Sequence, residues 1–178
     1  MKRVLDNIEP KEVLRYFEDI SQIPRASKDE KRISDYLLNF GKELGIEVVQ
    51  DENLNIYMRK KATPGYENGE TVIFQGHMDM VCEKNEGVSH DFKKDPIKLR
   101  VEDGKIYATD TTLGADNGIA VAYIMALMAS KDIPHPQIEA LITVEEETSM
   151  FGAKTFDPSF FKGKYLINVD STYDSKLL

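Results

Sequence analysis

The sequence has one cysteine, no long apolar run and no excess of positive charge. A single thiol, Cys82, cannot form a disulfide within the chain, which favours a reducing compartment. No run approaches the roughly 18 to 20 apolar residues of a membrane-spanning helix, and Asp6 interrupts the start before a secretory signal could form. The net charge of −8 argues against nucleic acid or an anionic membrane as main partner, since both attract a basic face. We therefore expect a cytoplasmic protein that binds neither.

The composition is that of a folded domain. The chain has 178 residues, enough for one domain with a sizeable core, and it is 41% hydrophobic and 30% charged. It contains no internal repeat and no low-complexity segment. One globular domain is the simplest expectation.

Helix and strand patterns alternate along the chain. Apolar residues recur at helical spacing over 10–23 and over 31–44, and Ser27-Lys28-Asp29-Glu30 before the second helix is a capping-box pattern. A third helix, 119–129, is apolar on most sides. Short strands are predicted at 46–50, 55–59, 72–75, 138–144 and 165–169, with a hairpin around 102–104. The last two of these five strands are nearly continuous apolar runs, typical of strands covered on both faces. The pattern predicts an α/β domain with a mixed central sheet.

A histidine and an aspartate follow the predicted strand 72–75 directly. His77 and Asp79 are two residues apart, so they share one face if the strand continues, and both can reach one ligand or one can hold the other. A histidine whose second ring nitrogen is held by a carboxylate is the usual arrangement at a metal site. Because this triplet often arises by chance, it predicts little alone.

Three further acidic clusters follow at strand ends or strand-to-helix turns. They are Asp116 in the glycine-rich turn 114–118, the run Glu145–Glu147, and Asp170. In open α/β sheets the ligand crevice lies beyond the carboxyl ends of the strands, so these acids and His77 are expected to meet there. Such a group of like charges needs cations to neutralise it. Histidine and carboxylate ligands suit zinc, and also manganese or cobalt, and a carboxylate bridging two ions would form a two-metal hydrolase site.

Taken singly, each cluster also has a structural explanation. The run Glu145–Glu147 could be solvated surface, Asp116 a helix N-cap and Asp170 a turn residue. We assign no function to His90, which lies in a polar loop, or to His135, which lies between two prolines. The order of all the clusters along one chain favours the functional explanation.

Longer motifs surround these clusters. They are His77–Val81, Thr111–Gly118, Glu146-Glu147 followed by Gly152-Ala153, and Asn168–Asp170, joined by Ser21–Ser27, Ser89–Phe92 and Lys94–Ile97. These motifs resemble those of the co-catalytic zinc dipeptidases and aminoacylases, and most closely the aminoacyl-histidine (Xaa-His) dipeptidases, the bacterial carnosinases. The resemblance extends over nearly the whole chain. It implies a three-layer α/β/α catalytic domain that hydrolyses dipeptides with two zinc ions.

The resemblance also implies a role for each ligand. His77 and Asp170 would bind one zinc ion, Glu147 would bind the other, and Asp116 would bridge both. Asp79 would hold and polarise the His77 imidazole. Family members hold the peptide bond after the bridging aspartate in the cis form, so a cis bond is expected after Asp116.

Glu146 is the expected general base. Three consecutive glutamates leave the choice open, but the family's interval to Gly152-Ala153 places the base at Glu146 and leaves Glu145 at the strand end. Glu146 would take a proton from water activated by the metal, and the resulting hydroxide would attack the peptide carbonyl. The protonated Glu146 would then donate to the leaving amine.

Two family features are missing from this sequence. The family completes its second zinc site with a later histidine, and no histidine follows His135. The family also inserts a second domain for substrate recognition and dimer contacts. We therefore expect residues 1–178 to be the N-terminal part of a catalytic domain, inactive alone, whose uncovered apolar surface favours self-association or a homodimer. Alternative functions are an aminoacylase or tripeptidase of the same superfamily, or a non-catalytic metal-binding or assembly module.

Overall fold

A five-stranded mixed sheet lies at the centre of the structure, a computed structural model that describes residues 3–170. Its strands, in spatial order, are β1 (Glu47–Gln50), β2 (Ile56–Lys60), β6 (Ile138–Thr143), β3 (Val72–His77) and β7 (Tyr165–Asn168). The strands β6, β3 and β7 are parallel, whereas β1 and β2 pair antiparallel with their neighbours. A separate hairpin joins β4 (Leu99–Glu102) to β5 (Lys105–Ala108).

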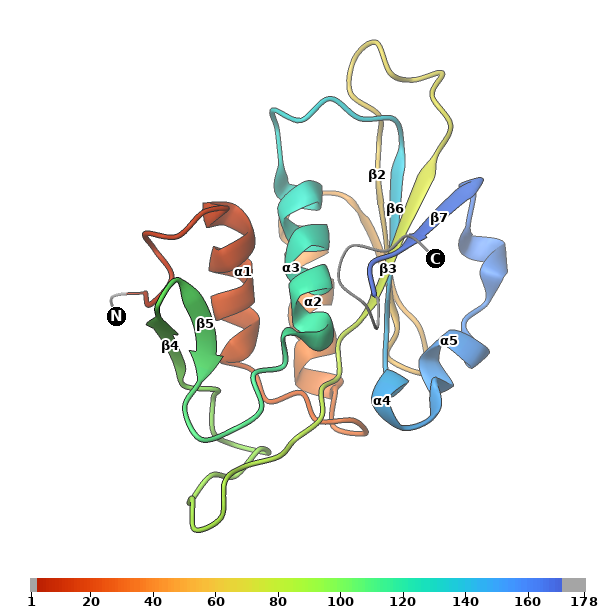
Figure 1. Cartoon of the computed structure of the whole chain (residues 1–178). Helices are drawn as coiled ribbons and strands as arrows, with labels where there is room; N and C mark the ends of the chain where they lie inside the picture. The colour runs from red at the N-terminus through yellow and green to blue at the C-terminus, as the bar shows by residue number, and fades with distance from the viewer. Residues whose placement is uncertain (1–2, 171–178) are drawn as a thin grey trace.

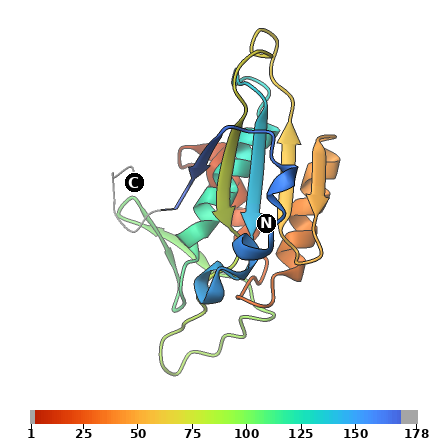
Figure 2. The ribbon, with the colours of Figure 1, turned by 90° about the vertical axis from the view of Figure 1, so that its right-hand side faces the viewer.

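Helices cover both faces of the sheet. On one face lie α1 (Lys11–Ser21), α2 (Lys31–Glu43) and α3 (Ala115–Ala129), and on the other lie the short helices α4 (Glu146–Ser149), α5 (Phe151–Thr155) and η1 (Pro158–Phe160) (Figure 1). Figure 2 looks onto the face that carries α4 and α5, with β1 and β7 at the two edges of the sheet. The structure confirms the predicted mixed sheet and three-layer α/β/α arrangement.

The main core lies between the sheet and the three longer helices. Helix α3 is apolar on most sides because it packs between α1 and the sheet, and its Val121 and Met125 are fully buried. From the sheet, the buried Met58 and Ile142 complete this core. The predicted helix 119–129 is thus confirmed; α3 as bounded starts at Ala115, but the backbone of Asp116 and Asn117 is not helical, so the regular helix follows Asn117. Within residues 3–170, none of the helices combines the length and apolarity that crossing a membrane requires.

The predicted capping box before α2 is wrong. The residue at the N-cap position is Glu30, and no side chain caps this helix. The Ser27 hydroxyl instead donates to Asp79 Oδ2 at 2.7 Å. The Ser27 hydroxyl, which local spacing predicted as a helix cap, therefore binds the buried carboxylate of Asp79 from a distant segment instead.

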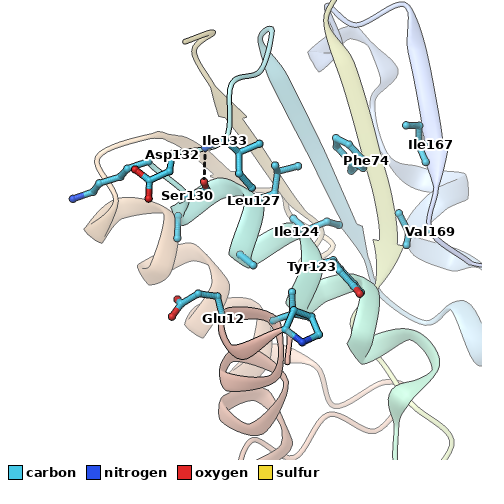
Figure 3. A pocket seen from close by; sticks show the side chains of 15 residues that line it. Glu12, Phe74, Tyr123, Ile124, Leu127, Ser130, Asp132, Ile133, Ile167 and Val169 are labelled. Atoms are coloured by element: carbon cyan, nitrogen blue, oxygen red, sulfur yellow. Dashed lines mark hydrogen bonds between the residues drawn. The ribbon is translucent and has the colours of Figure 1, made fainter. Parts of the chain in front are cut away.

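The prediction that both faces of the last strand are covered is wrong for the part of the chain that the structure describes. Strand β7 lies at the edge of the sheet, and nothing pairs with its outer edge among residues 3–170. Tyr165, Leu166 and Ile167 are 54%, 52% and 46% exposed. Beside β7, on the face that carries α1 and α3, lies an open apolar groove of about 840 Å³ (Figure 3). Its apolar lining includes Phe74, Tyr123, Leu127, Ile133 and Ile167.

Self-association of the chain stays a prediction, and β7 is where it should occur. An unpaired apolar edge strand is a template for pairing with another chain. We expect the average mass in light scattering to rise with protein concentration, and Ile167→Lys to suppress that rise. Val101→Lys is the matched control, because Val101 is 40% exposed on the separate β4–β5 hairpin. A mass that stays monomeric at every concentration would contradict this expectation.

Candidate metal centre

The acidic clusters meet at the carboxyl-terminal ends of the parallel strands. His77 ends β3, Asp116 begins α3, Glu146 begins α4 and Asp170 follows β7. Because β3, β6 and β7 run parallel, their carboxyl ends point to the same edge of the sheet, the lower one in Figure 1. Residues separated by up to 93 positions in the sequence are thereby brought together.

The ring nitrogen Nε2 of His77 faces three carboxylates. It lies 3.2 Å from Asp116 Oδ1, 3.8 Å from Asp170 Oδ2 and 3.8 Å from Glu146 Oε2. Ligand atoms of His77, Asp116 and Asp170 all lie within 4.8 Å of one another. Ligands at about 2.0–2.2 Å from a tetrahedral zinc ion lie roughly 3.4 Å apart, so small side-chain movements would let these three hold one. The donor set, one imidazole and two carboxylates, suits such an ion.

Glu147 is not a member of this three-residue group. Its pKa is raised, first by burial and then by the negative charge of Asp116. Two neighbouring carboxylates that repel one another are suited to a second cation. The role predicted for Glu147, ligation of a second ion beside Asp116, therefore stays a prediction.

The carboxylate of Asp79 is fully buried and accepts hydrogen bonds from several segments. His77 Nδ1 lies 3.2 Å from Asp79 Oδ1, and the Ser27 hydroxyl donates to Oδ2. The backbone N–H groups of Glu146 and Glu147 also donate to this carboxylate, at 3.0 and 3.2 Å. Asp79 thus lies beside the imidazole as predicted, and it also holds the start of α4, which the sequence did not indicate.

These contacts shift the pKa values of both partners. Burial alone would raise the pKa of Asp79, but hydrogen bonds from His77, Ser27 and the Glu146 amide outweigh it and hold the pKa below its ordinary value. Burial likewise lowers the pKa of His77, but the Asp79 hydrogen bond and the surrounding carboxylates raise it above its ordinary value overall. In the metal-free protein, His77 therefore gains a proton more readily than a free histidine does.

A second buried carboxylate, Glu30, extends this support. Glu30 is 3% exposed, and its Oε1 accepts the backbone N–H of Glu145 at 2.9 Å. Burial is the main cause of its raised pKa. Together, Glu30 and Asp79 accept hydrogen bonds from three consecutive backbone amides, those of residues 145–147. They therefore fix the position of the backbone that carries the Glu146 and Glu147 side chains. Local spacing placed Glu30 only in the capping-box pattern and did not indicate this contact, because its partner lies 115 positions away.

Asn117, near the start of α3, links the end of β3 to the segment that follows β7. Its Oδ1 accepts the backbone N–H of His77 at 3.1 Å, and its Nδ2 donates to the carbonyl of Val169 at 2.7 Å. The Asp116–Asn117 peptide bond is cis, as the resemblance implied. A Cβ at Gly76 would lie 2.5 Å from Asn117 Oδ1, so β3 needs a glycine next to His77.

Comparison with known proteins assigns the chain to a family. The model of the peptidase family M20/M25/M40 matches residues 73–172, more than half of the chain and all the residues discussed above as ligands or base. The chain belongs to this family. Peptidases of the M20 family are metal-dependent, which agrees with the donor set at His77, Asp116 and Asp170.

Relatives agree with this assignment. The chain is 38% identical over 173 residues to the cytosol non-specific dipeptidase of Escherichia coli, a match that covers 97% of this chain and 36% of the relative. The crystal structure of aminoacylhistidine dipeptidase from Vibrio alginolyticus superposes with a TM-score of 0.91 at 41% identity, over 94% of this chain and 34% of that one. Aminopeptidase PepT from Bacillus cereus gives 0.75 at 30% identity, over 90% of this chain and 43% of that one. This M20 chain thus spans about a third to two fifths of these relatives.

The site predicts pH-dependent metal binding. A histidine must be deprotonated to bind a metal, so protonation of His77 competes with the ion. Because the His77 pKa is raised in the metal-free protein, cobalt affinity measured by titration calorimetry should fall as the pH is lowered from about 8 to 6.

Asp116→Ala should weaken cobalt binding by more than tenfold, since it removes a direct ligand. His90→Gln is the matched control and should bind normally; equal losses in both variants would contradict the site.

Proposed function

We propose that this chain forms the metal-binding part of a dipeptidase that cleaves Xaa-His dipeptides. The observation that carries the proposal is the convergence of His77 Nε2 with the carboxylates of Asp116, Asp170 and Glu146 at one edge of the sheet, in a chain of the M20 family. We further propose that residues 1–178 are the N-terminal part of the catalytic domain.

The proposed centre would hold two zinc ions, which manganese or cobalt could replace. We assign His77 and Asp170 to one ion, Glu147 to the other, and Asp116 to both. The second ion requires a further ligand from outside this sequence. When bound, the ions polarise the peptide carbonyl and lower the pKa of water. The side chain of Asp116 is 73% exposed, so this side of the centre is open to solvent and to substrate.

Glu146 is proposed as the general base. Its backbone N–H is held by Asp79, and its carboxylate Oε2 lies 3.8 Å from His77 Nε2, beside the proposed ligands. From there it can take a proton from the attacking water and later donate it to the leaving amine. Asp79 serves this chemistry indirectly, because it orients the His77 ring and the start of α4 together.

The substrate class rests on the relatives. The Vibrio protein is an aminoacylhistidine dipeptidase and the Escherichia coli protein a non-specific dipeptidase, which supports dipeptides as substrates, with histidine as the proposed second residue. The likeness to the crystal structure of a tripeptidase from Staphylococcus aureus, with a TM-score of 0.76 at 25% identity, keeps a tripeptidase as the alternative. We also propose a cytoplasmic location, as the name of the Escherichia coli relative suggests.

A chimera tests the assignment of the base. In it, this chain replaces the matching 36% of the Escherichia coli dipeptidase, which supplies the remaining residues. Glu146→Gln should retain both metal ions yet lower kcat by about 10²–10⁴-fold, the typical contribution of a general base. Glu145→Gln is the matched control and should keep most activity. Loss of metal in Glu146→Gln would contradict the assignment of this residue as base.

Substrate preference is tested in the same chimera. We expect faster hydrolysis of β-alanyl-histidine and other Xaa-His dipeptides than of tripeptides or N-acyl amino acids. Faster cleavage of tripeptides would favour the tripeptidase alternative.

The 178-residue chain alone should show little turnover of dipeptides, because the second ion lacks a ligand. Dipeptide turnover by this chain that a chelator abolishes would contradict this expectation.

A further inference from the structure

Arg25 is a buried cation at the metal centre with no role in the proposed chemistry. It is 2% exposed and lies in the turn between α1 and α2. Its Nη1 donates to the carbonyls of Met78 and Asp79, at 3.0 and 3.3 Å, and its Nη2 donates to the carbonyl of Gly114. One guanidinium therefore joins the segment that follows β3 to the turn that precedes α3.

The surroundings of Arg25 give it only backbone partners. Burial lowers the pKa of this guanidinium to about 10, while the charge of Asp79 raises it, so Arg25 stays protonated at neutral pH. Burying a charge is costly unless it is well hydrogen-bonded, and an apolar side chain would fill the same space without that cost. The planar fork of arginine, however, can bind three carbonyls in two segments at once, which an apolar side chain cannot do.

Two glycines of the 111–118 motif leave room for this side chain. A Cβ at Gly114 would lie 2.5 Å from Arg25 Nη2, and a Cβ at Gly118 would lie 2.6 Å from the same atom. These glycines flank Asp116, the proposed bridging ligand. The turn that carries Asp116 is therefore shaped around Arg25.

The backbone next to Arg25 contacts the other side of the centre. The Arg25 carbonyl accepts the N–H of Met80 at 3.2 Å, and Ala26 forms a parallel bridge with Met80. One residue further on, the Ser27 hydroxyl donates to Asp79. Residues 25–27 thus lie alongside residues 78–80 like a short additional strand.

We propose that Arg25 is a positioning residue that sets the separation between the His77 side and the Asp116 side of the metal centre. This inference rests on the proposed metal-binding function. Because its side chain is almost fully buried, Arg25 does not contact substrate; it acts through the carbonyls of Met78, Asp79 and Gly114. A purely structural role would lower stability without changing how the centre coordinates a metal.

Cobalt binding distinguishes these two roles. Cobalt affinity and the visible absorption spectrum of the cobalt-loaded chain are measured for Arg25→Met, Arg25→Lys and the wild type. We expect Arg25→Met to lose about tenfold or more in affinity, the usual effect of removing support behind metal ligands, and to change its spectrum. Arg25→Lys keeps the charge but cannot reach both segments, so its affinity should be intermediate.

Lys60→Met is the matched control. Lys60 is a partly buried cation that, like Arg25, donates to backbone carbonyls; its partners, Leu127 and Ser130, lie at the far end of α3. We expect this variant to lose stability and to keep the wild-type affinity and spectrum. In Arg25→Ala, guanidinium ion added below denaturing concentrations should restore cobalt affinity. An unchanged spectrum and affinity in Arg25→Met, or equal losses in Lys60→Met, would overturn the inference.

Amide exchange separates failure of this inference from failure of the metal centre. If the wild-type chain binds no cobalt, the proposed function fails, and exchange in the metal-free chain still decides the role of Arg25. The Gly118 N–H donates to the Gly114 carbonyl, so its exchange should accelerate in Arg25→Met more than exchange at Ala140 in the buried strand β6. Equal acceleration at both amides would overturn the positioning role.

Discussion

The buried carboxylate of Asp79 is the interaction on which the arrangement of the site depends. It accepts hydrogen bonds from the Ser27 hydroxyl and from the amides of Glu146 and Glu147, and it contacts the His77 ring. An ionised carboxylate in the interior is stable only when its oxygens are satisfied in this way, and hydrogen bonds to a charged group are stronger than neutral ones. One charge therefore fixes the ring of the proposed ligand and the start of the helix that carries the proposed base.

Other polar side chains extend this frame around the cation site. Asn117 connects the end of β3 to the segment after β7, Glu30 holds the amide of Glu145, and Arg25 joins the β3 end to the turn before α3. Each of these groups is buried and hydrogen-bonds to backbone, so the frame is held by contacts within the chain. The proposed ligand Asp116 is by contrast largely exposed and is free to adjust when a cation binds.

Much of the fold could be predicted from the sequence, because local patterns of apolar residues indicate the helices and strands. A general rule then places ligand sites at the carboxyl ends of parallel strands. Apolar spacing predicted α3 and β6, and the rule that crevices lie at strand ends brought His77 and Asp170 together. The failures have a tertiary origin. Ser27 looked like a helix cap but hydrogen-bonds to a carboxylate 52 positions away, and apolar β7 looked buried but lies exposed at the edge of the sheet that residues 3–170 form. Supporting residues such as Glu30 have partners too distant in sequence for any local pattern to reveal.

Anomalous diffraction at the zinc edge, from crystals of the chain grown with zinc, is the most direct measurement of whether Asp79 supports a metal centre or belongs to it. We predict a zinc peak within bonding distance of His77 Nε2, Asp116 and Asp170, about 2.0–2.2 Å from each ligand atom. Asp79 should lie outside that distance and should still accept the amides of Glu146 and Glu147. A zinc ion bound directly by Asp79, or bound at a cluster that excludes His77, would contradict this assignment.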